Sequence, residues 1–201
     1  MIKKQKKYLA CFGLFLTSVI LGLTFFFIIK NKKQESVKHD VAKIEELRSR
    51  VLLHSHYSGH VTIPKDNKLK NIKGNLEYFS KVFPESKLVL YISSNQCNSC
   101  INDAVNKVET YLKTHPKFKY VIISKGFSLR ELKLMQTDRN IGAEIYALTD
   151  IELSFFNKMD EVQYPYYFVV NKNLEVSNVF FPIKSSSILE DRYFTKISEL
   201  Y

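Results

Sequence analysis

The chain has 201 residues, a formal net charge of +10 and an apolar content of 45%. This length suffices for one domain with a hydrophobic core and appended segments, and this composition excludes an intrinsically disordered chain. The basic runs at residues 3–7 and 30–33 flank an apolar segment, and no nucleic-acid-binding motif accompanies them. We therefore expect a membrane surface as their partner and no nucleic acid.

Residues 8–29 form an apolar segment without a charged side chain. An α-helix needs about 20 apolar residues to cross the hydrocarbon core of a bilayer. Because no small-residue cleavage site follows the segment, we interpret it as an uncleaved transmembrane signal anchor and not as a cleaved signal peptide. The lysines within residues 1–7 favour a cytoplasmic N-terminal tail. The rest of the chain would then be extracytoplasmic, where disulfide bonds persist.

Residues 30–60 are predicted to form a juxtamembrane helix and a linker. Apolar side chains within residues 35–53 recur every three or four positions, as on one face of a helix. His54, His56 and His60 follow this helix, and imidazole binds zinc and copper well. A polar linker is the simpler interpretation of these histidines, and a metal-carrier site is the alternative.

From residue 61 to residue 201 the chain is predicted to be one α/β domain. Residues 87–92 and 120–123 are short apolar runs, as in strands that are buried on both faces. Between them, residues 101–112 have apolar side chains at helical spacing. The order strand, helix, strand predicts a parallel βαβ unit with a right-handed crossover.

Further helix and strand signals follow this unit. Ser128 and Glu131 match a capping box, which predicts a helix that continues through Met135. Residues 143–147 are expected to form a strand, and residues 151–157 a short helix. The alternation of helices and strands is typical of an α/β sheet.

The C-terminal part is predicted to add a hairpin and a last helix. Residues 166–170 are an apolar run, and a turn at residues 171–173 connects them to an alternating strand at residues 174–181. Ser187 and Glu190 match a second capping box at the start of the last helix. The side chains expected to pack this helix on the sheet are Ile188, Leu189, Tyr193, Ile197 and Leu200.

Two cysteines in the sequence Cys97-Asn98-Ser99-Cys100 lie between a predicted strand and a predicted helix. Unpaired amides and the dipole at a helix N-terminus favour a thiolate, and they lower the pKa of such a cysteine from about 8.5 to about 3.5–7.5. Cys100 lies one helical turn further along, where it can close a disulfide with Cys97. The spacing favours thiol–disulfide exchange, in which Cys97 attacks a disulfide and Cys100 resolves the mixed disulfide.

Three other interpretations of this cysteine pair stay open. A structural zinc site needs two more ligands, and the sequence offers no second pair of cysteines. A copper carrier would use the two cysteines together with His54, His56 and His60. A non-catalytic scaffold would hold the cysteines as a structural disulfide, although so short a loop constrains the unfolded chain little.

Pro165 follows Tyr164 and directly precedes the strand predicted at residues 166–170. A proline in this place can mark the start of a strand or form a cis peptide bond in a tight turn. Together, LVLYISSNQCNSCINDAV and YPYYFVVNKNLEVSNVFF resemble the strand–CxxC–helix and the cis-proline hairpin of the thioredoxin superfamily. With its apolar N-terminal segment, the chain resembles the membrane-anchored, extracytoplasmic TlpA-like thiol–disulfide oxidoreductases of bacteria.

The resemblance covers residues 61–201 and implies a thioredoxin-like α/β fold, in which helices flank a central mixed sheet. It implies that Cys97 is the exposed nucleophile and that Cys100 is the buried resolving thiol. Pro165 would be a cis-proline beside the two cysteines. The implied location is the bacterial inner membrane, with a single span and the domain in the periplasm or an equivalent compartment.

The implied substrates are protein thiols and disulfides, which would bind beside Gln96, Tyr164 and Pro165. Tyr164 would offer its backbone groups to an extended substrate segment, as in β-augmentation. A membrane electron-transfer partner would reset the cysteine pair, and no cofactor is expected.

Three features depart from the pattern of the superfamily. Gln96 stands where an aromatic residue commonly precedes the first cysteine, and Asn98-Ser99 is neither the Gly-Pro of thioredoxins nor the Pro-His of strong oxidants. Tyr91 stands six residues before Cys97, where thioredoxins have a buried acid. Proton transfer to and from Cys100 therefore needs another group or water.

Overall fold

The structure is a computed structural model that describes residues 21, 24–35, 38, 40, 61–116, 118–148, 163–182 and 187–200. The chain divides into two compact units, Met1–Ser49 and Arg50–Tyr201. In the first unit, the described residues are helical and their side chains are exposed. Across the described ranges, no helix combines the length and the apolar character that crossing a membrane requires.

Several predicted features lie largely or wholly outside the described residues. They are most of the anchor at residues 8–29, most of residues 30–60 with all three histidines, and the helix at residues 151–157. These features stay predictions.

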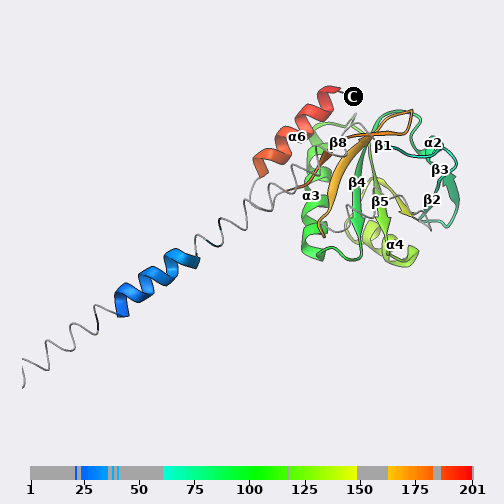
Figure 1. Cartoon of the computed structure of the whole chain (residues 1–201). Helices are drawn as coiled ribbons and strands as arrows, with labels where there is room; N and C mark the ends of the chain where they lie inside the picture. The colour runs from blue at the N-terminus through cyan, green and yellow to red at the C-terminus, as the bar shows by residue number, and fades with distance from the viewer. Residues whose placement is uncertain are drawn as a thin grey trace, which may run out of the picture. The chain divides into compact units, whose positions relative to one another are not determined.

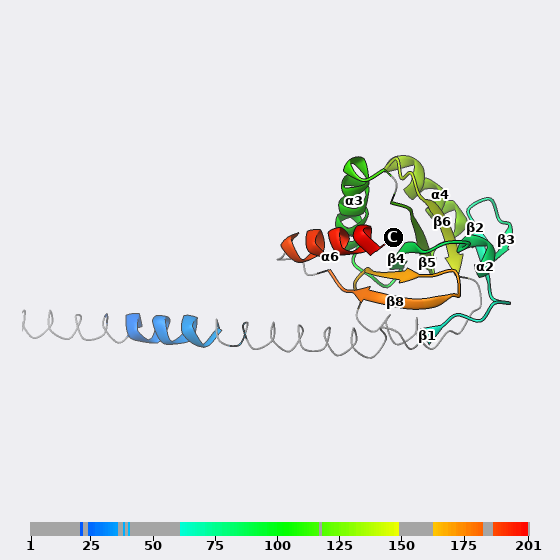
Figure 2. The ribbon, with the colours of Figure 1, turned by 90° about the horizontal axis from the view of Figure 1, so that it is seen from above.

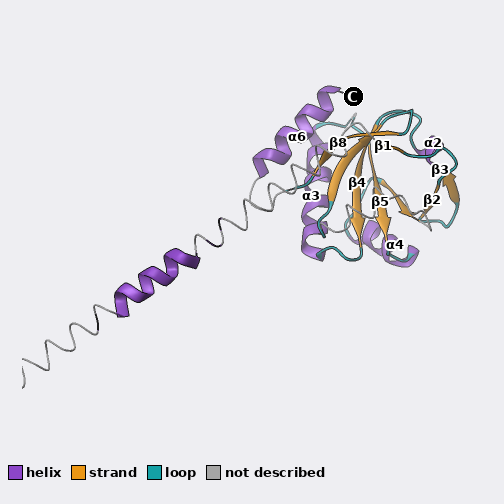
Figure 3. Ribbon diagram, in the orientation of Figure 1, coloured by secondary structure: helices purple, strands orange, loops and turns teal. Residues whose placement is uncertain are grey.

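The second unit contains an eight-stranded sheet with the strand order β1-β8-β7-β4-β5-β6-β2-β3 (Figure 1). Its strands are β1 (Val61–Thr62), β2 (Lys68–Asn71), β3 (Leu76–Tyr78), β4 (Lys87–Ser93), β5 (Tyr120–Lys125), β6 (Glu144–Leu148), β7 (Tyr166–Val170) and β8 (Glu175–Phe180). Its helices are α2 (Phe79–Val82), α3 (Asn98–Thr114), α4 (Leu129–Asp138) and α6 (Ser187–Leu200), which are drawn in purple in Figure 3.

The central strands of this sheet are the apolar runs that the sequence predicts. β4 pairs parallel with β5 and antiparallel with β7, so the sheet is mixed. The segment between β4 and β5 is α3, which confirms the predicted βαβ order. The strand expected at residues 143–147 corresponds to β6, which lies parallel to β5. At the start of α4, Ser128 and Glu131 form the predicted capping box.

The sheet has two differently covered faces, because successive side chains of a strand point to opposite sides. On the helical face, side chains of β4 such as Leu90 share a core with α3, α4 and α6. Figure 2 shows these three helices on one side of the sheet. On the aromatic face, Tyr91 of β4 stacks on Tyr166 with 4.7 Å between ring centroids. Tyr166 also contacts Phe168 and Phe181 there.

Two hairpins of the sheet turn around an asparagine. In the turn between β7 and β8, Asn171 Oδ1 accepts hydrogen bonds from the backbone amides two and four residues ahead. This confirms the turn predicted at residues 171–173. Asn71 makes the same two bonds between β2 and β3, at 3.0 Å each. The sequence analysis missed this second hairpin, because β2 lies within a basic run in which Leu69 is the buried residue.

The last helix, α6, packs on the sheet with part of the predicted face: Tyr193 and Ile197 contact the core as predicted, and the side chain of Leu200 lies outside the described residues. Phe194 and Ile197 are each 1% exposed and belong to the core of the helical face. Ile188 and Leu189 are exposed, so the prediction that they pack on the sheet is wrong. The physical reason is helical spacing, since Glu190, Phe194 and Ile197 are four and three residues apart and therefore share one side of the helix.

Candidate functional site

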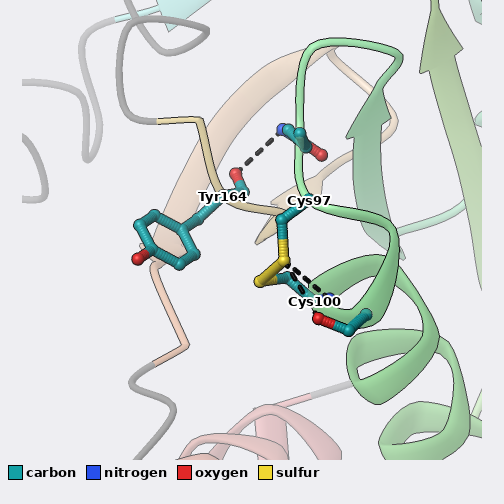
Figure 4. The surroundings of a disulfide bond; sticks show 5 residues. Cys97, Cys100 and Tyr164 are labelled. Atoms are coloured by element: carbon teal, nitrogen blue, oxygen red, sulfur yellow. Dashed lines mark hydrogen bonds between the residues drawn. A yellow bond between two sulfur atoms is a disulfide. The ribbon is translucent and has the colours of Figure 1, made fainter.

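Cys97 and Cys100 lie at the junction of β4 and α3 and form a disulfide bond (Figure 4). Cys97 is the N-cap residue of α3, with extended backbone angles, and Cys100 lies in the first turn of the helix. The two Cα atoms are 5.2 Å apart. The short loop after β4 thus presents the cysteine pair at the end of the central strand, as the sequence predicts.

The two sulfur atoms have different surroundings. Cys97 is exposed, whereas Cys100 is half-buried. Cys97 Sγ accepts a hydrogen bond from the Cys100 backbone amide at 3.1 Å, and Ser99 Oγ lies 3.2 Å from the same sulfur. The Cys100 amide, which also donates to the Cys97 carbonyl at 3.0 Å, the nearby hydroxyl and the helix dipole all favour a negative charge on this sulfur when the disulfide is reduced.

Gln96 fastens the loop of the cysteines to the loop before β7. Its side chain is 5% exposed, and its Oε1 accepts a hydrogen bond from the Ser93 backbone amide at 2.9 Å. Its Nε2 donates to the Tyr164 carbonyl oxygen at 2.8 Å (Figure 4). A direct contact between Gln96 and a substrate stays a prediction, while the structure gives this side chain a role in holding two loops together.

Pro165 is buried beside the cysteine pair, but its peptide bond is not in the expected form. Every peptide bond of the described residues is trans, including that between Tyr164 and Pro165. The expectation of a cis-proline is therefore wrong for this structure. The trans form of such a bond is favoured by about 0.5–1 kcal/mol, and here the Tyr164 carbonyl is held by Gln96.

A small cleft of about 40 Å³ extends from Cys100 along α3. The contribution of α3 comes from residues spaced three and four apart, which lie on one side of a helix. The residues that line the cleft are Cys100, Asp103, Ala104, Lys107, Tyr164, Pro165, Pro182 and Glu190. The cleft therefore joins the half-buried cysteine to the loop before β7 and to the start of α6.

Glu190 is a buried carboxylate that the sequence analysis assigned to a different role. Its side chain pairs with Lys107 Nζ of α3, and the residue is 1% exposed. Ser187 already belongs to the first turn of α6, so the capping-box interpretation of Glu190 is wrong. Burial raises the pKa of Glu190 above its usual range, while the hydrogen bond and the charge of Lys107 oppose this rise. The signal in the sequence was the spacing of Glu190 with the buried Phe194 and Ile197.

The position six residues before Cys97 holds no acid in this chain. Tyr91 is fully buried and stacked on Tyr166 within the aromatic face. Among the described residues, the buried side chain with an ionisable carboxylate is that of Glu190. Of the two acids that line the cleft with Cys100, Asp103 of α3 is exposed, and the buried one comes from the last helix and not from β4.

The structure gives no support to the metal-carrier interpretation within its described ranges. Those ranges contain no group of three or more histidine, cysteine or acidic side chains placed to hold a metal ion. His54, His56 and His60, which the copper interpretation requires, lie outside them.

Comparison with known proteins identifies the fold. No protein family matches the sequence, and no curated protein matches it significantly. Among solved structures, the C-terminal domain of a proposed thiol-disulfide oxidoreductase from Bacteroides thetaiotaomicron is similar, with a TM-score of 0.52 and 13% identity over 72% of this chain and 97% of that chain.

Two further solved structures give TM-scores of 0.49. A thiol-disulfide oxidoreductase from Bacteroides fragilis shares 12% identity over 70% of this chain and 100% of that one. A thiol:disulfide interchange protein of the thioredoxin family from Chlorobium tepidum shares 17% identity over 70% of this chain and 96% of that one. The fold argument rests on the Bacteroides thetaiotaomicron domain and on the sheet order. The chain therefore has the thioredoxin-like α/β fold that its sequence predicts.

Proposed function

We propose that the chain is a membrane-anchored, extracytoplasmic thiol–disulfide oxidoreductase that exchanges disulfides with protein substrates. The observation that carries this proposal is the exposed Cys97 at the N-cap of α3, paired in a disulfide with the half-buried Cys100. This arrangement gives one accessible sulfur that is stabilised as a thiolate and one sheltered sulfur within reach of it.

In the reducing direction the Cys97 thiolate attacks one sulfur of a substrate disulfide. A mixed disulfide forms, and the other substrate sulfur leaves with the electron pair and takes up a proton. Cys100 then loses its proton and attacks Cys97 Sγ, so that the second substrate sulfur leaves and is protonated. Two electrons and two protons pass to the substrate, and the Cys97–Cys100 disulfide forms. Oxidation of a substrate dithiol is the same sequence in reverse.

The substrate is proposed to lie as an extended segment along the loop before β7. Tyr164 would offer backbone groups to it, and Gln96 already uses one lone pair of the Tyr164 carbonyl. That bond orients the Tyr164 carbonyl beside the cysteine pair. Main-chain pairing of this kind suits many protein substrates.

The membrane anchor is a separate part of the proposal. Its support is the uncharged apolar sequence of residues 8–29 and the five apolar side chains at residues 25–29, which are 50–66% exposed on a helix. An anchored domain would lie beside a membrane electron-transfer partner that resets the cysteine pair. Carbonate extraction of bacterial membranes should leave the full chain in the pellet and release a variant without residues 8–29. Release of the full chain would contradict the anchor.

The exchange reaction is tested with the full chain in detergent, in a Cys11→Ser background so that only the pair at residues 97 and 100 reacts. We expect a reduction potential of about −270 to −120 mV in glutathione or dithiothreitol buffers, the range of exchange proteins. Cys100→Ala should trap substrate proteins as mixed disulfides on a non-reducing gel, and Cys97→Ala should trap none. A potential below about −300 mV, which is typical of structural disulfides, would favour the scaffold interpretation.

A further inference from the structure

The resolving step of the proposed exchange requires a group that accepts the proton of Cys100. Cys100 is half-buried, and its thiol has no helix N-cap position of its own to favour ionisation. On β4, Tyr91 is stacked within the aromatic face and belongs to the core on the side of the sheet away from α3. A proton acceptor must therefore be sought on the helical face.

Asp103 and Glu190 line the cleft with Cys100, and of these two acids Glu190 is the buried one. It lines the same cleft as Cys100, and it is 1% exposed. Its Oε2 pairs with Lys107 Nζ, but no described residue donates a hydrogen bond to its buried Oε1. Buried polar atoms are normally hydrogen-bonded, so an unsatisfied oxygen on a carboxylate that lines a cleft with a thiol marks a place where a proton can bind.

We propose that Glu190 takes up the proton of Cys100 when Cys100 attacks the mixed disulfide, and returns it when the Cys97–Cys100 disulfide is reduced. This inference rests on the proposed exchange function. In the forward step the proton passes from Cys100 Sγ to Glu190 Oε1, while the sulfur keeps the electron pair with which it attacks Cys97. In the reverse step the same proton returns to the leaving Cys100 thiolate. The cleft volume of about 40 Å³ has room for a water that can relay the proton.

The charges around Glu190 set how readily it holds a proton. The titratable and charged groups that surround its carboxylate are Cys100, Asp103 and Lys107 of α3, Asp191 of α6, Tyr167 of β7 and Tyr164 of the loop before β7. Burial raises the pKa of Glu190, and the negative charges of Asp191 and Asp103 add to the rise, whereas Lys107 opposes it. A carboxylate whose pKa lies nearer the working pH is a better partner for a thiol than a free one.

Lys107 keeps this carboxylate from becoming a permanently protonated group. Its side chain is 35% exposed, so it can move its ammonium group between Glu190 and solvent. A buried pair of this kind can also be purely structural. The two roles differ in what they change, because a structural pair affects folding while a proton carrier affects one kinetic step and its dependence on pH.

The test measures the two steps of exchange separately. The reduced full chain, in detergent and in a Cys11→Ser background, is mixed with the aromatic disulfide 5,5′-dithiobis(2-nitrobenzoate) in a stopped-flow spectrometer. The first, concentration-dependent release of thionitrobenzoate reports the attack by Cys97. The second, concentration-independent release reports the attack by Cys100 on the mixed disulfide.

For Glu190→Gln we expect the second step at pH 7 to be slower by about 100-fold, the lower end of the range for general acid–base catalysis. Its rate should rise about tenfold per pH unit, because the step then depends on the fraction of Cys100 that has ionised to solvent, whereas the rate of the unmodified chain should level off above the pKa of Glu190. The first step should stay within twofold. Glu199→Gln, the same change at an exposed site of α6, should alter neither step.

Two more variants keep the test decisive if Glu190→Gln folds poorly. Glu190→Asp retains a carboxylate, so the rate of its second step should still level off with rising pH. In Lys107→Met the pH at which this rate levels off should be higher. An unchanged second step in Glu190→Gln, or an unmoved profile in Lys107→Met, would overturn the inference while exchange stays intact. Absence of any release from the unmodified chain would overturn the proposed function and the inference with it.

Discussion

The two faces of the central sheet differ at the strand that leads to the cysteines. On the aromatic face, Tyr91 stacks on Tyr166 within an apolar core. On the helical face, Glu190 and Lys107 form an ion pair close to the Cys100 cleft. Both faces bury large aromatic side chains, but a buried carboxylate occurs, among the described residues, on the helical face alone.

This difference shows where the fold can tolerate a charge near the cysteines. Burying an isolated carboxylate is strongly unfavourable unless a partner compensates it. Lys107 provides that partner. It lies seven residues after Cys100, on the same side of α3. None of the described lysines and arginines is buried in the core of the aromatic face. The acid therefore resides on α6, and β4 has a tyrosine.

The largest effect is expected from removing the sulfur of Cys97, which follows the strand that the two faces share. Cys97→Ser should reduce exchange with a protein disulfide to the rate of buffer alone, because a serine hydroxyl is not ionised near neutral pH and forms no disulfide. The measurement is the rate of reduction of insulin by the full chain with dithiothreitol as the electron donor. Cys11→Ser is the control and should keep the original rate. A substantial rate in Cys97→Ser would place the chemistry elsewhere.

The second prediction concerns an acid introduced on the aromatic face. Tyr91→Asp should lower the free energy of unfolding by about 3–5 kcal/mol, since it leaves a buried carboxylate without a cationic partner. Urea unfolding followed by far-UV circular dichroism gives this value. Tyr91→Phe keeps the stacked ring and should change exchange by less than about twofold. A stable and active Tyr91→Asp variant would mean that the two faces are equivalent.

The third prediction concerns Gln96, which links the loop of the cysteines to the loop before β7. Gln96→Ala removes the partners of the buried Ser93 amide and of the Tyr164 carbonyl. We expect a loss of about 1–3 kcal/mol in the free energy of unfolding, the cost of leaving buried polar groups unsatisfied. The neighbouring Asn95→Ala, at an exposed position, should change it by less than about 0.5 kcal/mol. Equal effects of the two variants would contradict the role of Gln96 in holding the loops.

Much of the central fold could be predicted because it follows from local patterns. The apolar runs of β4, β5 and β7 and the spacing of α3 specify buried strands and an amphipathic helix without knowledge of the rest of the chain. The position of Cys97 at the start of α3 follows from the same patterns. These features depend on neighbours in sequence, and the structure confirms them.

The parts that could not be predicted depend on contacts between distant residues. Glu190 and Lys107 are 83 positions apart, and the bond from Gln96 to Tyr164 spans 68 positions. The local signal at Glu190 pointed to a capping box, because the capping pattern and the first position of a buried helix face coincide there. Sequence spacing alone could not decide whether Glu190 caps the helix or is buried, since its burial depends on α3, which packs against α6 and supplies Lys107.

The smallest expected effect is a dependence of stability on pH, and it compares two carboxylates with opposite surroundings. Burial raises the pKa of Glu190 above the 4.5 of an unperturbed glutamate, so the folded chain keeps this proton to higher pH than the unfolded chain. The contribution of Glu190 to stability is therefore fully present below pH 4.5 and is lost as the pH rises through the folded pKa. Hydrogen bonds from Ser128 lower the pKa of Glu131, so its contribution is present above pH 4.5 and is lost as the pH falls through its folded pKa.

Urea unfolding across pH 3–8 should show that Glu190→Gln becomes relatively more stable than the unmodified chain as the pH rises, while Glu131→Gln becomes relatively less stable. The same sign for both variants would mean that Lys107, and not burial, dominates the ionisation of Glu190.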